Sequence, residues 1–184
     1  MENFFISYFQ DIKGTLDKIN LNILRKVNDI LFDALNKGNQ IFTMGNGGSG
    51  VTASHFVCDL NKGVSFGQKK KFKAICLNDN LPTLLAYAND LSYSDIFCEQ
   101  LKNFMEEKDI VIGFSGSGNS ENVLKAIEHA NKNRAITIGF SGFDGGKLAK
   151  IAKHSIIVSI DDMQKIEDIH LILCHLIMQT MKKF

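Results

Sequence analysis

The sequence predicts an α/β fold in which a doubly wound, five-stranded parallel sheet is sandwiched between helices. Two observations predict it. Short, mostly apolar runs alternate with helical segments along the chain, a pattern that suits parallel strands covered on both faces. Several of these runs also lead directly into loops rich in glycine, serine and asparagine. In such folds ligands bind beyond the carboxyl ends of the strands, so we expect the site in the loops that follow Met44, Leu77, Phe114 and Phe140.

The individual elements follow from these patterns. Five apolar runs are expected to be strands, at residues 40–44, 72–77, 109–114, 135–140 and 155–159. Two amphipathic helices, 2–19 and 21–37, precede them, and in the second the apolar residues recur at steps of three and four. Lys37 and Gly38 form a typical helix end. Further helices are expected at about 49–60, 80–88, 92–105, 120–132 and 145–151, and a long apolar helix at 162–182 closes the chain.

Composition favours an ordinary globular protein. The chain has 184 residues with 21 basic and 20 acidic side chains, which suits a single domain, 1–184, and no nucleic-acid partner. Because it has no apolar stretch of about 18 residues and no signal peptide at Met1, we expect no membrane contact and a cytoplasmic location. The four cysteines are widely spaced and are expected to be reduced.

Two glycine-rich loops carry the strongest functional signal. Residues 45–50 read Gly-Asn-Gly-Gly-Ser-Gly between a strand and a helix, where glycines let a ligand approach the main chain and the helix N-terminus favours an anion. The loop matches neither a Walker A motif nor a dinucleotide fingerprint, so we expect no nucleotide cofactor. Its alternative interpretation is a tight strand-to-helix turn.

The second loop, residues 114–120, reads Phe-Ser-Gly-Ser-Gly-Asn-Ser, again between a strand and a helix. Its hydroxyls and amides are suited to binding a phosphate without a positive side chain. Ser120 could instead cap the next helix, but capping would explain only one of the three serines.

The order and spacing of these two loops resemble the SIS (sugar isomerase) domain, and nearly the whole chain resembles the phosphoheptose isomerases within that family. The resemblance also covers Ala88-Asn89-Asp90, residues 142–146 and the segment 165–170 in the last helix. It implies a flavodoxin-like SIS fold and a phosphosugar substrate. The matching substrate- and phosphate-binding positions are Asn46, Gly47, Ser49, Asn89, Asp90, Ser115, Ser117, Ser120 and Glu167. For Asn89 and Asp90, on a predicted loop, a helix-ending turn is the alternative.

The resemblance implies an aldose–ketose isomerase that converts sedoheptulose 7-phosphate to D-glycero-D-manno-heptose 7-phosphate through an enediol-type proton transfer, for heptose and surface-glycan biosynthesis. In the family a glutamate one helical turn after a histidine acts as base, and a histidine on the last helix acts as acid. The matching residues are Asp59, after His55, and His175. His55 and Asp59 are four residues apart and therefore share one helix face. His170 points elsewhere and could support a neighbour's site, whereas His55 and His175 could also be structural histidines.

Two positions depart from the family pattern. Asp59 stands where the family has glutamate, and the loss of one methylene shortens the reach by about 1.5 Å. Either the pocket is built around the shorter base, or the substrate differs, or activity is weak. Glu167 stands where the family usually has glutamine. Some members bind zinc through the corresponding residues, which here are His55, Asp59, Glu167 and His175. Two histidines and two carboxylates suit a divalent metal.

Alternatives to this isomerase remain. The protein could isomerise another ketose phosphate, or it could be a non-catalytic SIS module that binds a phosphosugar or a protein. The final helix is apolar on most sides, with Leu171, Ile172, Leu176 and Ile177 among its residues. Such a helix should be buried. The resemblance implies a homotetramer with active sites at subunit boundaries, and we expect the helical pair at residues 1–38 to be used in oligomerisation.

Overall fold

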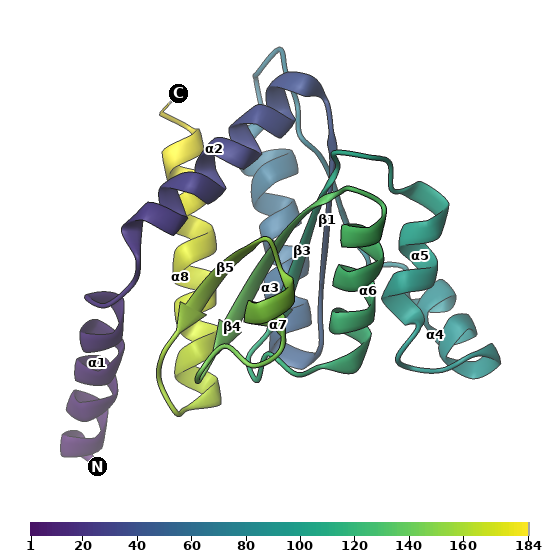
Figure 1. Cartoon of the computed structure of the whole chain (residues 1–184). Helices are drawn as coiled ribbons and strands as arrows, with labels where there is room; N and C mark the ends of the chain where they lie inside the picture. The colour runs from purple at the N-terminus through teal and green to yellow at the C-terminus, as the bar shows by residue number, and fades with distance from the viewer. Residues whose placement is uncertain (184) are drawn as a thin grey trace.

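The computed structural model of the chain describes residues 1–183 and contains one five-stranded parallel sheet (Figure 1). The strand order is β2-β1-β3-β4-β5, which is the flavodoxin-like order of the doubly wound folds. The strands are β1 (Gln40–Gly45), β2 (Lys73–Cys76), β3 (Ile110–Ser115), β4 (Ile136–Gly142) and β5 (His154–Val158). The predicted fold class is therefore confirmed. The expected domain of residues 1–184 ends at Phe184, which lies outside the described residues.

The reversal of strand order between β1 and β3 decides where a ligand can bind. β1 pairs with β2 on one side and with β3 on the other, so the chain leaves β1 and β3 in opposite directions. In doubly wound folds ligands bind at such a reversal, beyond the carboxyl ends of the two strands. The glycine loop (45–50) and the serine loop (115–120) are those two loops.

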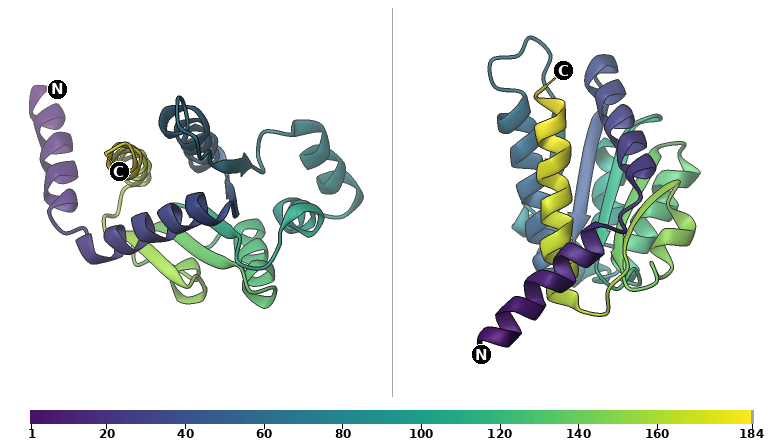
Figure 2. Two further views of the ribbon diagram at one scale, coloured as in Figure 1. Left: turned by 90° about the horizontal axis from the view of Figure 1, so that it is seen from above. Right: turned by 90° about the vertical axis from the view of Figure 1, so that its left-hand side faces the viewer.

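Helices cover both faces of the sheet, as Figure 2 shows from above. One apolar core lies between the sheet and α2 (Leu21–Lys37), α3 (Gly47–Cys58), η1 (Asp59–Val64) and α8 (Met163–Met181). The other lies against α4 (Leu81–Asp90), α5 (Ile96–Phe104), α6 (Glu121–Lys132) and α7 (Leu148–Ile151). β3 is buried along its whole length, which explains its continuous apolar sequence.

Several helix boundaries differ from those expected. The first helix, α1 (Glu2–Leu16), stops short of residue 19 because Asn20 caps α2 by accepting hydrogen bonds from the amides of Asn22 and Ile23. The helix expected at 92–105 begins only at Ile96, and Ser92 instead bonds within the preceding turn. The helix expected at 145–151 shrinks to α7, since Gly145 and Gly146 adopt φ of +93° and +57°. A left-handed backbone cannot continue an α-helix.

The π-helix η1 was not expected. It continues α3 directly, so the helix expected at 49–60 runs two residues earlier and four residues later. Its wider turn is visible where the amide of Ser65 donates to the carbonyl of Leu60, five residues back. π-helices are rare and are frequent at functional sites, and this one begins at Asp59.

α1 projects away from the rest of the molecule (Figures 1 and 2). Two polar contacts anchor it to α8: the hydroxyl of Tyr8 donates to Asp168 at 2.6 Å, and the ammonium of Lys165 pairs with Asp11 at 2.9 Å. The hydrogen bond to Asp168 raises the pKa of Tyr8 to about 12. Among the described helices none is both long and apolar enough to cross a bilayer.

His170 is a core residue and does not reach toward a neighbour's site. Its side chain is fully buried, packs edge-on against Phe114 and Phe140, and places Nε2 3.2 Å from the carbonyl of Ser141. Burial lowers its pKa to about 4, because a charged imidazolium loses its solvation there. The expectation that His170 could support an adjacent site is thus corrected.

Acid destabilisation is therefore expected to depend on His170. The unfolded chain binds a proton near pH 6.5 and the folded chain only near pH 4, so stability falls as the pH drops through this window. The expected loss from this residue is about 3 kcal/mol. Urea unfolding at pH 7 and pH 4.5 checks it: His170→Gln should show a clearly smaller difference between the two pH values. An unchanged difference would contradict the assignment.

Candidate active site

The glycine loop begins where β1 ends and opens helix α3. Gly47 adopts φ of +54°, a conformation that side chains rarely take. Position 48 also requires glycine, because the carboxylate of Glu167 occupies the space that a Cβ would need. Ser49 is buried in the first turn of α3, whereas Asn46 and Gly47 reach the surface. The loop thus offers Asn46 and exposed backbone to a ligand.

Three polar residues that sequence reasoning missed hold this loop in place. Asn78, just after β2, accepts from the amide of Gly45 at 3.2 Å and donates to its carbonyl at 2.8 Å. Asn46 exchanges two amide hydrogen bonds of 2.9 Å with Asn122, and its Oδ1 also accepts from the hydroxyl of Tyr93 at 2.8 Å. Asn78 could have been predicted, because it is a polar residue just after the second strand. The pairings of Asn46 with Asn122 and Tyr93 could not, because they join segments that are far apart in the sequence.

The serine loop joins β3 to α6. Ser115 is buried at the strand end and donates to the hydroxyl of Ser120 at 3.0 Å. Ser120 occupies the N-cap position of α6 but makes no capping hydrogen bond, so capping does not explain this serine. Ser117 lies at the turn and accepts from the amide of Asn119 at 3.2 Å. The hydroxyls of Ser115 and Ser120 therefore lie together at the N-terminus of α6, an arrangement suited to binding a phosphate.

The loop that follows β4 supports the serine loop. Gly118 adopts φ of +64°, and a Cβ there would collide with the backbone of Gly145. The amide of Gly142 donates to the carbonyl of Gly116 at 2.8 Å, and that of Leu148 donates to Gly118 at 2.8 Å. Segment 142–146 therefore acts as a scaffold for the serine loop.

Asn89 and Asp90 were predicted to lie on a loop, with a helix-ending turn as the alternative. In the structure they form the last turn of α4. Both are exposed, and the Asn89 amide donates to the Asp90 carboxylate at 2.8 Å. The helix begins after Asn80, which caps it, with a proline in the first turn, and it ends at Leu91, whose φ of −120° and ψ of −93° are not helical. Contact of these residues with a sugar remains a prediction.

His55, Asp59 and His175 form a compact cluster between α3 and α8. The two Nε2 atoms of the histidines are 2.9 Å apart, and Asp59 Oδ2 lies 3.5 Å from His55 and 3.8 Å from His175. The histidine side chains are 45% and 46% exposed, while Asp59 is only 13% exposed. The predicted acid–base residues are thus adjacent, with two half-exposed imidazoles beside a mostly buried carboxylate.

Asp59 has an unusual polar environment. Its Oδ2 is buried and has no hydrogen-bond partner among the described residues, because both histidine nitrogens are beyond hydrogen-bond distance. Buried carboxylate oxygens normally have partners. Directly beside it, burial and then the charge of Asp59 raise the pKa of the Cys174 thiol well above its usual value. An unsatisfied carboxylate oxygen is available to take a proton or to bind a cation.

The structure separates the predicted site residues into two groups within one chain. Asp59 lies twelve residues after Gly47 along α3 and η1, about 18 Å down the helix. Met163, at the start of α8, packs against Gly116 in the serine loop. His175 lies twelve residues further along α8, which is again about 18 Å. The His55–Asp59–His175 cluster therefore does not adjoin the glycine and serine loops of its own chain.

Glu167 belongs to the loop group and not to the histidine cluster. Its carboxylate packs against Gly48, and it is eight residues, or about 12 Å, from His175 along α8. Within residues 1–183 the group of potential metal ligands comprises His55, Asp59 and His175, whose ligand atoms all lie within 4.8 Å of one another. The expected four-residue metal set is thus not assembled within one chain.

Comparison with known proteins agrees with this architecture. A family model described as the SIS domain matches residues 7–142, the region that contains both loops, His55 and Asp59. The chain therefore belongs to the SIS domain family.

Within this family the chain is similar to phosphoheptose isomerases. It is 35% identical to a probable phosphoheptose isomerase of Thermoplasma acidophilum over 90% of this chain and 91% of that protein. It is also 35% identical to phosphoheptose isomerase 1 of Campylobacter jejuni, over 85% and 83% of the two chains. The solved structure of the phosphoheptose isomerase from Francisella tularensis superimposes with a TM-score of 0.91 at 26% identity, covering 100% of this chain and 96% of that one.

Proposed function

We propose that this protein is a sugar-phosphate isomerase that interconverts sedoheptulose 7-phosphate and D-glycero-D-manno-heptose 7-phosphate. The observation that carries the proposal is the conjunction of a serine loop suited to phosphate with a separate carboxylate–histidine cluster suited to proton transfer. The relatives named phosphoheptose isomerase support the choice of substrate.

The chemistry assigns a task to each group. A ketose becomes an aldose when a base removes a proton from C1, the electrons form an enediol, and the proton returns to C2. We assign the transfer of that proton to Asp59, because its Oδ2 is buried and has no hydrogen-bond partner within residues 1–183. His175, whose side chain is 46% exposed, would move the proton between the two sugar oxygens. A purely structural pair of histidines would not need an unsatisfied carboxylate between them.

A site completed by a second copy reconciles this chemistry with the separation of the two groups. In an extended seven-carbon sugar phosphate, C2 lies roughly 9 Å from phosphorus by bond lengths, whereas the serine loop and the cluster of one chain are about 18 Å apart along α8. We therefore infer that the loops of one copy bind the phosphate while Asp59 and His175 of another copy act on the carbonyl end.

The His55–Asp59–His175 cluster also fits a zinc ion. Tetrahedral zinc with bonds of about 2.0–2.1 Å places its ligand atoms about 3.3 Å apart, and the three ligand–ligand distances here are 2.9, 3.5 and 3.8 Å. The buried, unpaired Oδ2 of Asp59 is the donor that such an ion would satisfy. Bound zinc would act as a Lewis acid toward the sugar carbonyl. A fourth protein ligand, such as Glu167, would come from another copy.

Zinc binding predicts a thermal shift. Zinc at about 100 times its Kd should stabilise the protein by about 2.7 kcal/mol, and His55→Gln with His175→Gln should abolish that gain. Differential scanning calorimetry with and without zinc, on protein without a histidine tag, measures it. His129→Gln is the matched control, since His129 lies on α6. No bound metal and no zinc-dependent shift in the wild type would contradict the assignment.

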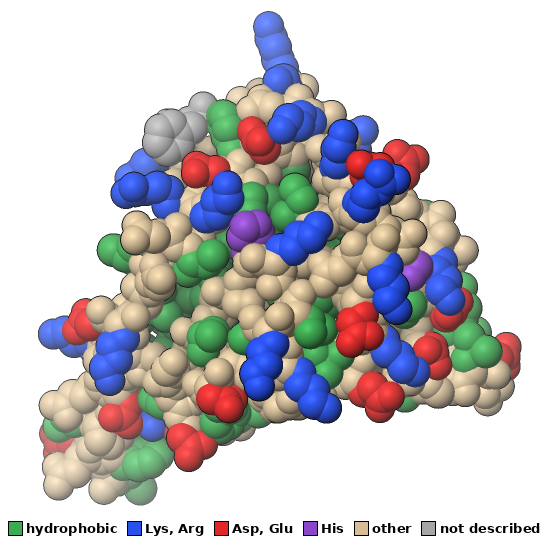
Figure 3. Space-filling view, viewed as in Figure 1, with side chains coloured by type: hydrophobic (Ala, Val, Ile, Leu, Met, Phe, Trp, Pro, Cys, Tyr) green, Lys and Arg blue, Asp and Glu red, His purple; other side chains and the backbone are tan. Residues whose placement is uncertain are grey.

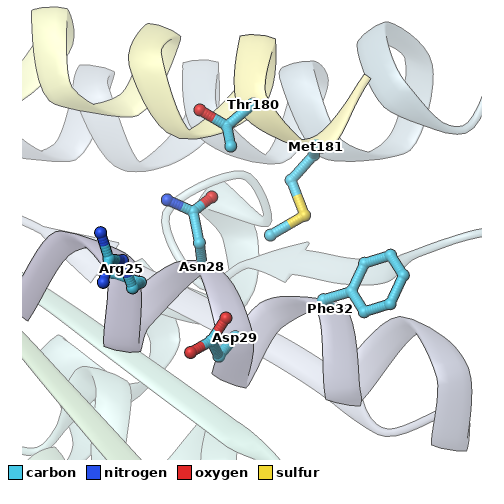
Figure 4. Close-up of a pocket in the computed structure, with 6 residues that line it drawn as sticks. All are labelled: Arg25, Asn28, Asp29, Phe32, Thr180 and Met181. Carbon is cyan, nitrogen blue, oxygen red and sulfur yellow. The ribbon is translucent and has the colours of Figure 1, made fainter. Parts of the chain in front are cut away.

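Apolar surface on the outer helices supports self-association. Phe4, Phe5 and Phe9 on α1 are 66%, 53% and 70% exposed, an arrangement that soluble monomers rarely leave uncovered. A groove of about 500 Å³ lies between α2 and the end of α8 (Figure 4). Phe32 and Met181 line it, and Asn28 Oδ1 is buried without a hydrogen-bond partner in the described part of the chain. We propose that further copies of this chain cover these surfaces, in a tetramer.

A change in mass is therefore expected when α1 is made polar. The double variant Phe4→Ser, Phe9→Ser should shift the light-scattering mass at micromolar concentration from a multiple of 20.5 kDa toward smaller species, and turnover should fall with it. Lys13→Ser, also on α1, is the control. A wild-type mass of one chain would contradict both the oligomer and the shared active site.

The proposed reaction is tested by NMR on purified protein with sedoheptulose 7-phosphate as substrate. Appearance of the heptose 7-phosphate aldose supports the proposal. Saturable binding without turnover would favour another ketose phosphate, and fructose 6-phosphate and ribulose 5-phosphate would be assayed in parallel. If the protein neither bound nor converted these sugar phosphates, a non-catalytic module would be favoured.

A further inference from the structure

A second cavity lies at the opposite edge of the sheet from both loops. It has a volume of about 280 Å³ and sits beneath α2, where three strands begin. Ile110, Ile136 and His154 are the first residues of β3, β4 and β5 and line its inner side. Because both phosphate loops follow the carboxyl ends of the strands, this cavity is distinct from the site described above.

The charges around the cavity are unbalanced. Four lysines line it, Lys26, Lys37, Lys108 and Lys153, together with a single carboxylate, Asp33. Asp33 is already paired with Lys37 at 2.9 Å. Within residues 1–183 Lys26 and Lys108 form no ion pair, while Lys153 donates to the carbonyl of Ala135 at 2.6 Å. Figure 3 shows lysine and arginine side chains on the face that carries α2.

This concentration of positive charge is local, because the whole chain carries a net charge of only +1. His154 responds to it: burial is the main cause that lowers its pKa, and the charges of Lys26 and Lys153 lower it further. A positive potential that suppresses protonation of an imidazole also attracts an anion.

The floor of the cavity is apolar. Ile30, Ala34 and Ile110 are 7%, 2% and 1% exposed, and they face the same space as the lysines. Ligand pockets typically combine an apolar lining with a few polar groups that fix orientation. Inorganic phosphate alone would use only the charged rim, whereas a phosphate ester would also cover the isoleucines.

We propose that this cavity is a second anion-binding site, which takes a small phosphorylated metabolite. Lys26 and Lys108 hold the phosphate and the apolar floor contacts the carbon skeleton. Lysine is well suited to this role because its ammonium binds phosphate as a point charge. The proposal does not depend on the isomerase activity, since the two sites occupy opposite edges of the sheet.

Calorimetric titration of the full chain tests the proposal, with inorganic phosphate and phenyl phosphate as probes. Ser117→Glu is introduced first, so that a carboxylate repels phosphate from the serine loop. We expect this variant to retain one binding event per chain. Adding Lys26→Glu and Lys108→Glu should weaken that binding by about 10-fold or more. Adding Lys18→Glu and Lys71→Glu, two exposed lysines outside the cavity, should not.

The outcomes separate the parts of the proposal. Tighter binding of phenyl phosphate than of inorganic phosphate supports the role of the apolar floor, and equal affinity would overturn the assignment to an organic ligand. Absence of binding in Ser117→Glu, or equal weakening by both lysine pairs, would overturn the site itself. Unfolding temperatures of the lysine variants, whose side chains are exposed, confirm that each one is folded.

Discussion

Asp59→Asn is expected to lower kcat/KM for sedoheptulose 7-phosphate by about 10³-fold, within the usual range for loss of a general base. The substitution keeps the size of the side chain but removes its ability to take a proton. Because Asp59 acts at the carbonyl end of the sugar while the loops of another copy bind the phosphate, KM should change much less than kcat. Steady-state kinetics on the pure variant measure both constants.

Asp59→Glu is the matched control for this prediction. It restores a carboxylate at the length that the family uses, so its activity should lie well above that of Asp59→Asn even if it is below the wild type. If Asn and Glu variants were equally impaired, a packing role for Asp59 would be favoured. If the Asn variant kept wild-type kcat, the acid–base assignment would be wrong.

Two inactive variants are expected to restore activity when they are assembled together. Ser117→Glu disables the phosphate loop, and His175→Ala disables the acid–base cluster. In mixed oligomers a site that draws its loop from one copy and its cluster from another can be wholly intact. Random mixing predicts about one quarter of the wild-type activity. Unfolding and refolding the two variants together, followed by assay, measures the recovery.

The control is each variant refolded alone, which should stay inactive. If the loop and the cluster of one chain formed the active site, no combination of these variants would contain an intact site. Complete absence of recovery in oligomers shown to be mixed would therefore contradict the shared site. The experiment needs only the positions of the two groups and no knowledge of the interface.

The strands and the two loops could be predicted because each has a local signal. The five apolar runs coincide with the five strands, and the glycine and serine motifs lie at the ends of β1 and β3. The π-helix could not be predicted, since its i to i+5 bonding leaves no residue pattern of its own. The contacts of Asn46 with Asn122 and Tyr93 join segments 76 and 47 residues apart, and only the folded chain brings them together.

The position of the acid–base cluster is a different case. The spacing of His55 and Asp59 predicted that they share a helix face, and in the structure His55 Nε2 lies 3.5 Å from Asp59 Oδ2. The same helix geometry also implies that Asp59 is about 18 Å from the glycine loop, but this consequence becomes visible only once α3 is seen to start at Gly47. Glu167 was grouped with His175 by resemblance, and the helical rise between them separates them.

The most direct test of the isomerase is the reaction run in D₂O. Sedoheptulose 7-phosphate is incubated with the wild-type protein, and NMR follows both the appearance of the aldose and its label at C2. Proton transfer through an enediol by Asp59 exposes the proton to solvent, so we expect aldose that carries deuterium at C2, and none with Asp59→Asn. The account would be contradicted if the wild-type protein formed no aldose and exchanged no proton of the ketose for deuterium.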